Sequence, residues 1–190
     1  VTHQGTFDLA ALSMIPNMTI MQPKDGNERA NMLDFAATFV EPLAIRYAKA
    51  YDYDFDEHTD VSGLQWETLA RSNSNVTILA AGNRAIKAAL GLHGATVVNA
   101  RVIKPLDREF LDSVSDGAVV VTVEDGIVRG GFGESVRSYF AKTRKRAEVV
   151  TVGYDDKFID TLSETAILES GGLTTEALKE RIRTATGIEL

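Results

Sequence analysis

The 190-residue sequence has no cysteine, only four prolines, one tryptophan and fewer basic than acidic side chains. The absence of cysteine excludes disulfide bridges and thiolate metal ligands, and it favours a reducing compartment, here the cytoplasm. A formal net charge of −7 argues against nucleic acid as a partner, which would require a basic face. Apolar runs such as 118–123 are far too short to cross a bilayer, so we expect no membrane partner either.

What is present is the composition of an ordinary globular protein, with 44% hydrophobic and 25% charged residues. A short apolar run at 18–22 follows Pro16 and Asn17, which predicts a turn and then a strand. The sequence "PLAIRYAKA" at 42–50 alternates after its proline and predicts a second strand.

A helix is expected between these two strands. Asp25 and Glu28 have the capping-box spacing that marks a helix start. Apolar residues then recur at three- and four-residue steps, which predicts one buried helix face made of Ala30, Leu33, Ala36, Ala37 and Val40. Two strands and one helix offer too little apolar area to fold alone, so we expect residues 1–50 to pack on something else.

The chain then changes character. The stretch "YDYDFDEHTD" at 51–60 is acidic and has no helical period, and polar residues follow it as far as Asn75. We interpret 51–72 as a linker between residues 1–50 and a second unit at 73–190.

The second unit alternates strands with helices. Strands are expected in "NVTILAAG", "TVVNARVI", "GAVVVTVED" and "EVVTVGY", and helices are expected at 84–90, from about 107, and at 132–142, 163–170 and 174–186. Near-continuous valine and isoleucine runs indicate strands buried on both faces. The pattern therefore predicts an α/β fold with three layers and a mostly parallel sheet.

Several patterns suggest chemistry but have simpler interpretations. Asp52, Asp54 and Asp56 alternate as in a calcium-binding loop, but the glycine and glutamate that such a loop requires are missing, so a solvated linker is favoured. The glycines at 130, 131 and 133 lie between a strand and a helix, where backbone N–H groups can receive a phosphate. A tight turn with close packing also requires glycine, and we favour that interpretation.

The acidic, basic and histidine candidates also have structural interpretations. Glu124 and Asp125 end a strand and are expected to cap the next turn rather than act in catalysis. The basic run at 142–146 ends a helix, which its positive charges stabilise. His58 and His93 have no ligand-spaced partners, so no metal ligand and no cofactor-binding residue is assigned.

For His3 and for Arg46, the sequence favours a functional role and a structural role equally. His3 lies in "THQG", where a hydroxyl and an amide can orient an imidazole. Arg46 lies on the opposite strand face from Leu43 and Ile45, an unusual place for a charge unless an anion meets it.

Several segments of the sequence together resemble those of a known family. The runs "THQGTFDLAALSMIPNMTIMQPKDGNE", "PLAIRYAKA", "VIKPLD", "VTVEDGIVRGGFGESV" and "ILESGGLTTEAL" resemble the C-terminal part of the 1-deoxy-D-xylulose-5-phosphate synthases, a family of the transketolase group. The resemblance covers nearly the whole chain. Where the family commonly has RYPRG, this chain has RYAKA at 46–50, so no contact is carried over from the family's second basic residue.

The resemblance implies roles for each part of the chain. Residues 1–50 would be the last strand-helix-strand piece of a pyrimidine-binding domain, and 73–190 would be a transketolase C-terminal domain. His3 would be the catalytic residue that faces the substrate oxygens, and Arg46 would bind the phosphate of the acceptor. Thr2 and Gln4 would shape the loop. Thiamine diphosphate and Mg²⁺ would be bound by sequence outside this chain, and none is expected on the chain itself.

The resemblance also implies a reaction and partners. The family condenses pyruvate with glyceraldehyde 3-phosphate, with loss of carbon dioxide, to make a precursor of isoprenoids, thiamine and pyridoxal. The chain is then expected to be an inactive fragment that requires the N-terminal domains of the same enzyme, in a homodimer. Two alternatives remain: a docking and dimerisation module with Val119–Val123 at its core, or a separately encoded C-terminal half of another transketolase-like enzyme.

Overall fold

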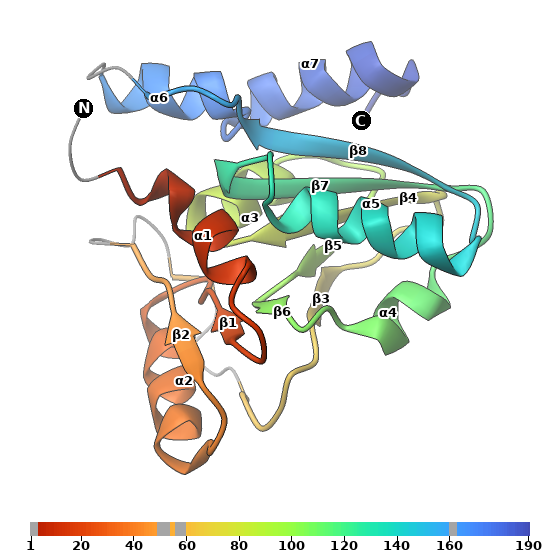
Figure 1. Ribbon diagram of the computed structural model, residues 1–190. Coiled ribbons are helices and arrows are strands. Elements are labelled where there is room, and N and C mark those ends of the chain that lie inside the picture. The colour runs from red at the N-terminus through yellow and green to blue at the C-terminus, as the bar shows by residue number, and fades with distance from the viewer. Residues whose placement is uncertain (1–3, 49–53, 56–59, 160–162) are drawn as a thin grey trace.

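A computed structural model describes residues 4–48, 54–55, 60–159 and 163–190. The chain forms two sheets with helices packed around them (Figure 1). The elements before the second unit are η1 (Gly5–Phe7), α1 (Asp8–Ser13), β1 (Thr19–Met21), α2 (Gly26–Thr38), β2 (Leu43–Ile45) and β3 (Glu67–Ala70). The later elements are β4 (Val76–Ala81), α3 (Asn83–Leu90), β5 (Thr96–Asn99), β6 (Val102–Lys104), α4 (Arg108–Ser113), β7 (Ala118–Ile127), α5 (Phe132–Thr143), β8 (Ala147–Tyr154), α6 (Glu164–Gly171) and α7 (Thr175–Thr186).

The larger sheet has five strands in the order β3-β5-β4-β7-β8. Strands β5, β4, β7 and β8 pair in parallel, and β3 joins the edge in antiparallel orientation. The apolar residues of β4 alternate between two cores: Ile78 faces one, and Leu79 faces the other. Both faces of the sheet are therefore buried, which explains its valine-rich strands.

The helices cover the two faces separately. Side chains of α3 and α7, including Ile86 and Leu178, pack in one core. Side chains of α4 and α5, including Leu111 and Phe132, pack in the other. Two helical layers around a mostly parallel sheet confirm the predicted three-layer α/β fold.

The smaller sheet joins the first fifty residues to the rest of the chain. Strand β1 pairs in parallel with β2 and in antiparallel orientation with β6, which follows β5 in the sequence. Ile20 and Met21 are fully buried in the same core as Trp66 and Val102. The first strands thus pack on the second unit, as their small apolar area requires.

The prediction of one strand over "TVVNARVI" was wrong, because the run is divided between the two sheets. β5 ends at Asn99, and β6 begins at Val102. Between them, the Ala100 N–H donates to Ala80 O in the large sheet, whereas Arg101 O accepts from Gln22 N beside the small sheet. Strand β3, within the stretch interpreted as a linker, was not predicted at all.

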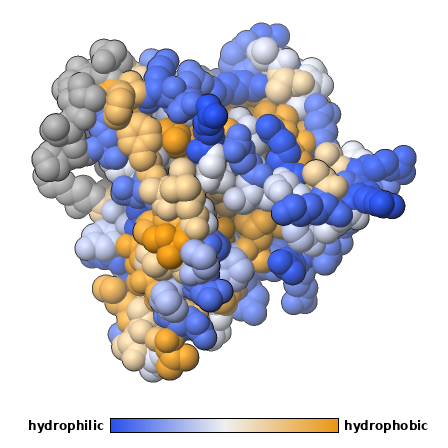
Figure 2. Space-filling view, in the orientation of Figure 1, coloured by the Kyte–Doolittle hydropathy of each residue, from blue (hydrophilic) through white to orange (hydrophobic). Residues whose placement is uncertain are grey.

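Helix α2 confirms the predicted helix but not the predicted burial of its apolar face. The Asp25 carboxylate accepts from the Glu28 N–H at 2.8 Å, so Asp25 is the N-cap. However, Leu33 is 53% exposed, and Val40 lies beyond the end of the helix and is 94% exposed. The fully buried residues of the helix are Glu28 and Met32 instead. Figure 2 shows apolar side chains gathered on the outside of this end of the molecule.

Among the helices in the described ranges, none combines the length and the hydropathy that crossing a bilayer would require.

Candidate functional site

The first candidate site lies where the N-terminal segment meets the end of β7. A Cβ at Gly126 would lie 3.4 Å from Thr6 O and 3.6 Å from Leu9 Cδ1, so backbone and side chain of the N-terminal segment rest directly on this strand. The register between β7 and β8 shifts between Val123 and Ile127. Such irregularities change the direction of side chains, and here the shift coincides with Glu124 and Asp125.

Arg46 extends from the end of β2 into this corner. Its backbone N–H donates to Met21 O at 2.9 Å, which continues the β1–β2 pairing. Its guanidinium Nη2 donates to Gly5 O at 3.4 Å, and Nη1 lies 3.9 Å from Asp125 Oδ2. The side chain is only 17% exposed. Arg46 therefore contacts Gly5, the last residue of the "THQG" sequence.

Asp125 is in turn held by another residue of the second unit. The Tyr154 hydroxyl at the end of β8 donates to Asp125 Oδ1 at 3.3 Å. Burial, and then the neighbouring Asp125 charge, raise the pKa of the Tyr154 phenol. The phenol therefore stays protonated and remains a donor at physiological pH.

Glu124 points the other way and caps a helix. Its two carboxylate oxygens accept the backbone N–H groups of Phe132 and Gly133, each at 2.8 Å, at the start of α5. Burial raises the pKa of Glu124 to about 7, although these two hydrogen bonds oppose the shift. The predicted capping role is confirmed for Glu124.

The glycine-rich turn before α5 serves this packing. A Cβ at Gly131 would collide with the Glu124 carboxylate and with Ile127 O, and a Cβ at Gly133 would collide with Thr122. The close-packing interpretation of these glycines is confirmed. The amides that could have received a phosphate already bind Glu124.

Gln4 ties the same N-terminal segment to the second unit by a two-way contact. Its Nε2 donates to Ile159 O at 2.6 Å, and its Oε1 accepts from the Ile159 N–H at 3.0 Å. This pairing holds the segment against the connection after β8. His3, the other predicted site residue, lies outside the described residues, as does His58.

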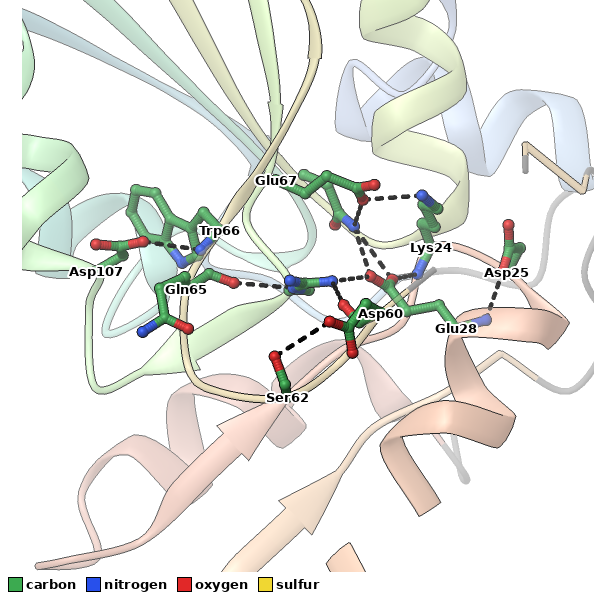
Figure 3. Close-up of polar contacts among 11 residues, drawn as sticks. Lys24, Asp25, Glu28, Asp60, Ser62, Gln65, Trp66, Glu67 and Asp107 are labelled. Carbon is green, nitrogen blue, oxygen red and sulfur yellow. Dashed lines mark hydrogen bonds and ion pairs between the residues drawn. The ribbon is translucent and has the colours of Figure 1, made fainter. Parts of the chain in front are cut away.

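A second cluster of polar groups joins the two units (Figure 3). Lys24 is fully buried, and its Nζ lies 2.8 Å from Glu67 Oε2. Glu28, also fully buried, accepts from Asn99 Nδ2 at 2.9 Å and from Arg101 Nη1 at 3.3 Å. This interface network therefore pairs residues of the first unit with residues around β3 and β5.

Arg101 is the centre of this network. Besides Glu28, it donates through Nε to Gln65 O at 2.8 Å and through Nη1 to Asp60 O at 2.9 Å. Burial raises the pKa of Glu28, and the Lys24 N–H, Asn99 and Arg101 oppose that shift. Sequence reasoning missed the network, because Arg101 lay within a predicted strand and gave no separate signal.

The described residues do not fit the diphosphate and Mg²⁺ end of a thiamine cofactor. No group of three histidine or acidic side chains within them could hold a metal ion. The helix start with glycine-rich sequence already binds Glu124. What the corner provides is an arginine with spare donors beside a backbone loop.

Comparison with known proteins agrees with this architecture. The family described as "Transketolase, C-terminal domain" matches residues 65–178, and the one described as "Transketolase, pyrimidine binding domain" matches residues 1–51. The fold and these two matches define an α/β domain of the transketolase type with part of a second domain packed on it. The chain belongs to the transketolase C-terminal domain family.

Two curated relatives are named 1-deoxy-D-xylulose-5-phosphate synthase. The protein from Clostridium perfringens is 35% identical over 95% of this chain, and the one from Bacillus cereus is 36% identical over 96%. The chain spans 31% of the length of each of these two relatives. The predicted relation to this family is confirmed.

Solved structures support the fold. A protein titled "Split gene transketolase, inactive beta4 tetramer" matches with a TM-score of 0.83 and 28% identity, over 99% of this chain and 64% of that one. A transketolase from Leishmania mexicana matches with a TM-score of 0.65 and 19% identity, over 98% of this chain and 27% of that one.

Proposed function

We propose that this chain supplies the C-terminal part of a 1-deoxy-D-xylulose-5-phosphate synthase, which joins pyruvate to glyceraldehyde 3-phosphate with loss of carbon dioxide. Thiamine diphosphate supplies the carbanion chemistry when it is bound, together with Mg²⁺, by protein outside this chain. The observation that carries the proposal is the position of Arg46, five-sixths buried, against Gly5 of the "THQG" loop.

Arg46 suits the recognition of the phosphate on the acceptor substrate. A guanidinium group has five N–H donors in a planar fork that matches phosphate. Of the contacts within the described residues, only the one to Gly5 O uses the side chain as a hydrogen-bond donor, at a long 3.4 Å. The remaining donors are then available to an anion.

His3 is proposed as the residue that hydrogen-bonds the substrate oxygens and moves a proton there. The support is its place in the sequence, two residues before Gly5, whose carbonyl accepts from Arg46. The imidazole and the guanidinium would thus serve the same substrate from one loop and one strand end.

The proposed domain division is 1–50 for the end of the pyrimidine-binding domain, 51–72 for the linker and 73–190 for the C-terminal domain. The family match at 1–51 supports the first boundary, whereas the match at 65–178 begins within the proposed linker. Strand β3 lies within the proposed linker. The last residues of the linker would therefore belong to the sheet of the second domain.

A second candidate is a separately encoded C-terminal half of a transketolase-like enzyme. The support is the "Split gene transketolase" relative, whose sequence is 28% identical over 99% of this chain. In both cases the active protein would be an assembly, with a homodimer of the complete enzyme as our expectation. Both candidates predict no activity for the chain alone.

The test is product formation from pyruvate and glyceraldehyde 3-phosphate with thiamine diphosphate and Mg²⁺. The chain alone is expected to give no 1-deoxy-D-xylulose 5-phosphate. The chain joined to, or mixed with, the protein that carries the Mg²⁺–diphosphate site is expected to give it. Transfer of a two-carbon unit between sugar phosphates instead would favour the second candidate, and turnover by the chain alone would contradict both.

A further inference from the structure

Asp125 lies beside Arg46 without making a hydrogen bond to it. The distance from Nη1 to Oδ2 is 3.9 Å, whereas hydrogen bonds between charged groups are about 2.7–2.9 Å long. The two side chains are 17% and 16% exposed, so solvent screens this pair only in part. Asp125 therefore balances the charge of Arg46 without taking up any of its N–H groups as hydrogen-bond donors.

Tyr154 accounts for the position of Asp125. Its hydroxyl binds the carboxylate oxygen that does not face Arg46, at 3.3 Å. The Tyr154 ring is fixed in turn, because it is 3% exposed and packs closely on the backbone of Gly171. Asp125 is thus held by β8 at a distance from the guanidinium group.

The pair Asp125–Tyr154 belongs to the second unit, whereas Arg46 belongs to the first. The contact therefore brings a negative charge of the C-terminal domain next to the group that the proposed function assigns to a phosphate. Like charges repel across such a partly buried site. Asp125 would weaken the binding of a phosphate to Arg46. Tyr154 would keep the Asp125 carboxylate from competing with that phosphate for the guanidinium N–H groups.

We propose that Asp125 and Tyr154 set how tightly Arg46 binds a phosphate group. Tyr154 restrains Asp125, so that an entering phosphate takes the guanidinium hydrogen bonds. The charge of Asp125 limits the affinity, which favours release of a phosphorylated product. This inference rests on the proposed function and adds two positioning residues from the second unit to its site.

The test uses the assembled enzyme and inorganic phosphate as a competitor of glyceraldehyde 3-phosphate. Asp125→Asn keeps the shape and can still accept from Tyr154, but it removes the charge, so the inhibition constant of phosphate should fall about fivefold. Tyr154→Phe frees the carboxylate to approach Arg46, so the constant should rise about threefold. Asp155→Asn, an exposed residue with the same change of net charge, should leave the constant unaltered.

The two variants are expected to change the inhibition constant of phosphate in opposite directions, which general damage to the fold would not produce. An unchanged or higher constant in Asp125→Asn would overturn the inference, and an unchanged or lower one in Tyr154→Phe would overturn the role of Tyr154. The Arg46→Ala variant distinguishes failure of this inference from failure of the proposed function. If it abolishes competition by phosphate while Asp125→Asn changes nothing, only this inference fails; if competition persists without Arg46, the proposed function fails as well.

Discussion

At the scale of single residues, the end of β7 contains two adjacent acids with different tasks. Glu124 is fully buried and binds the start of α5, whereas Asp125 faces Arg46. The sequence predicted a cap for these acids, because acids that end a strand commonly bind the next turn. It could not separate the two, since their directions depend on the register shift after Val123.

The buried carboxyl group of Glu124 makes stability depend on pH. Its folded pKa of about 7 lies above the unfolded value of 4.5. The stabilisation is therefore complete below pH 4.5, declines as the pH rises and is lost above 7. Between pH 5 and 8 this group should lower the free energy of unfolding by about 2 to 3 kcal/mol.

The measurement is urea unfolding of the wild type and Glu124→Gln at pH 5 and pH 8. We expect the variant to be less stable than the wild type at pH 5, because its amide NH₂ group faces backbone N–H donors. The difference in unfolding free energy between the two proteins should be smaller at pH 8. Parallel pH profiles for the two proteins would show that Glu124 does not titrate in this range.

Arg46 was recognised from the sequence as a charge on the wrong face of a strand. Its surroundings were not predicted, because Gly5, Asp125 and the Tyr154 that binds Asp125 come from three distant segments. Only the packing of the first unit on the second brings Asp125 and Tyr154 to Arg46. Periodicity describes one element at a time and carries no information about such contacts.

At the scale of elements, the strands and helices of the second unit followed from periodicity and turn residues. α3, α5, α6 and α7 lie within about one residue of their predicted ranges. The failure at "TVVNARVI" has a physical reason: apolar residues continue on both sides of Arg101, although the backbone changes sheet there. Burial of Arg101 by Glu28 and two carbonyl groups makes that passage possible.

The interface network should therefore matter for stability. Arg101→Met leaves the Glu28 carboxylate buried without its cation and should cost about 3 to 5 kcal/mol of unfolding free energy at neutral pH. The loss should shrink at lower pH, because a protonated Glu28 no longer requires a counter-charge. Chemical unfolding at two pH values measures both effects.

A matched control is Arg146→Met, which removes an exposed ion pair with Asp116. Exposed pairs contribute little, so this variant should unfold like the wild type. Equal losses for the two variants would contradict a special role for the network. Adding Glu28→Gln to Arg101→Met should recover part of the stability, since it removes the uncompensated charge.

At the scale of the whole molecule, exposed apolar residues contradict the sequence prediction of a buried helix face. The three- and four-residue spacing predicted that Leu33 and Val40 lie on a buried face, but nothing in the described residues covers them, and both are exposed. Met14 and Tyr47 are exposed too, at 79% and 54%. Figure 2 shows apolar side chains gathered on the outside of the molecule near α2, and an exposed apolar patch typically marks contact with another protein.

We therefore expect the chain to associate through this face. Leu33→Glu combined with Val40→Glu should reduce the mass that light scattering detects at high concentration, whereas Ser115→Glu, on the exposed turn before β7, should not. A wild-type chain that stays strictly monomeric at high concentration would contradict self-association through this face.

The central claim is that Arg46 binds the phosphate of the acceptor. The most direct measurement is the ratio of kcat/KM for glyceraldehyde 3-phosphate to that for glyceraldehyde, in the assembled enzyme and in its Arg46→Ala variant. Loss of a hydrogen-bonded charge pair should lower this ratio about a hundredfold, or roughly 3 kcal/mol. Arg71→Ala, at an exposed position, should keep the wild-type ratio. An unchanged ratio in Arg46→Ala would contradict the account.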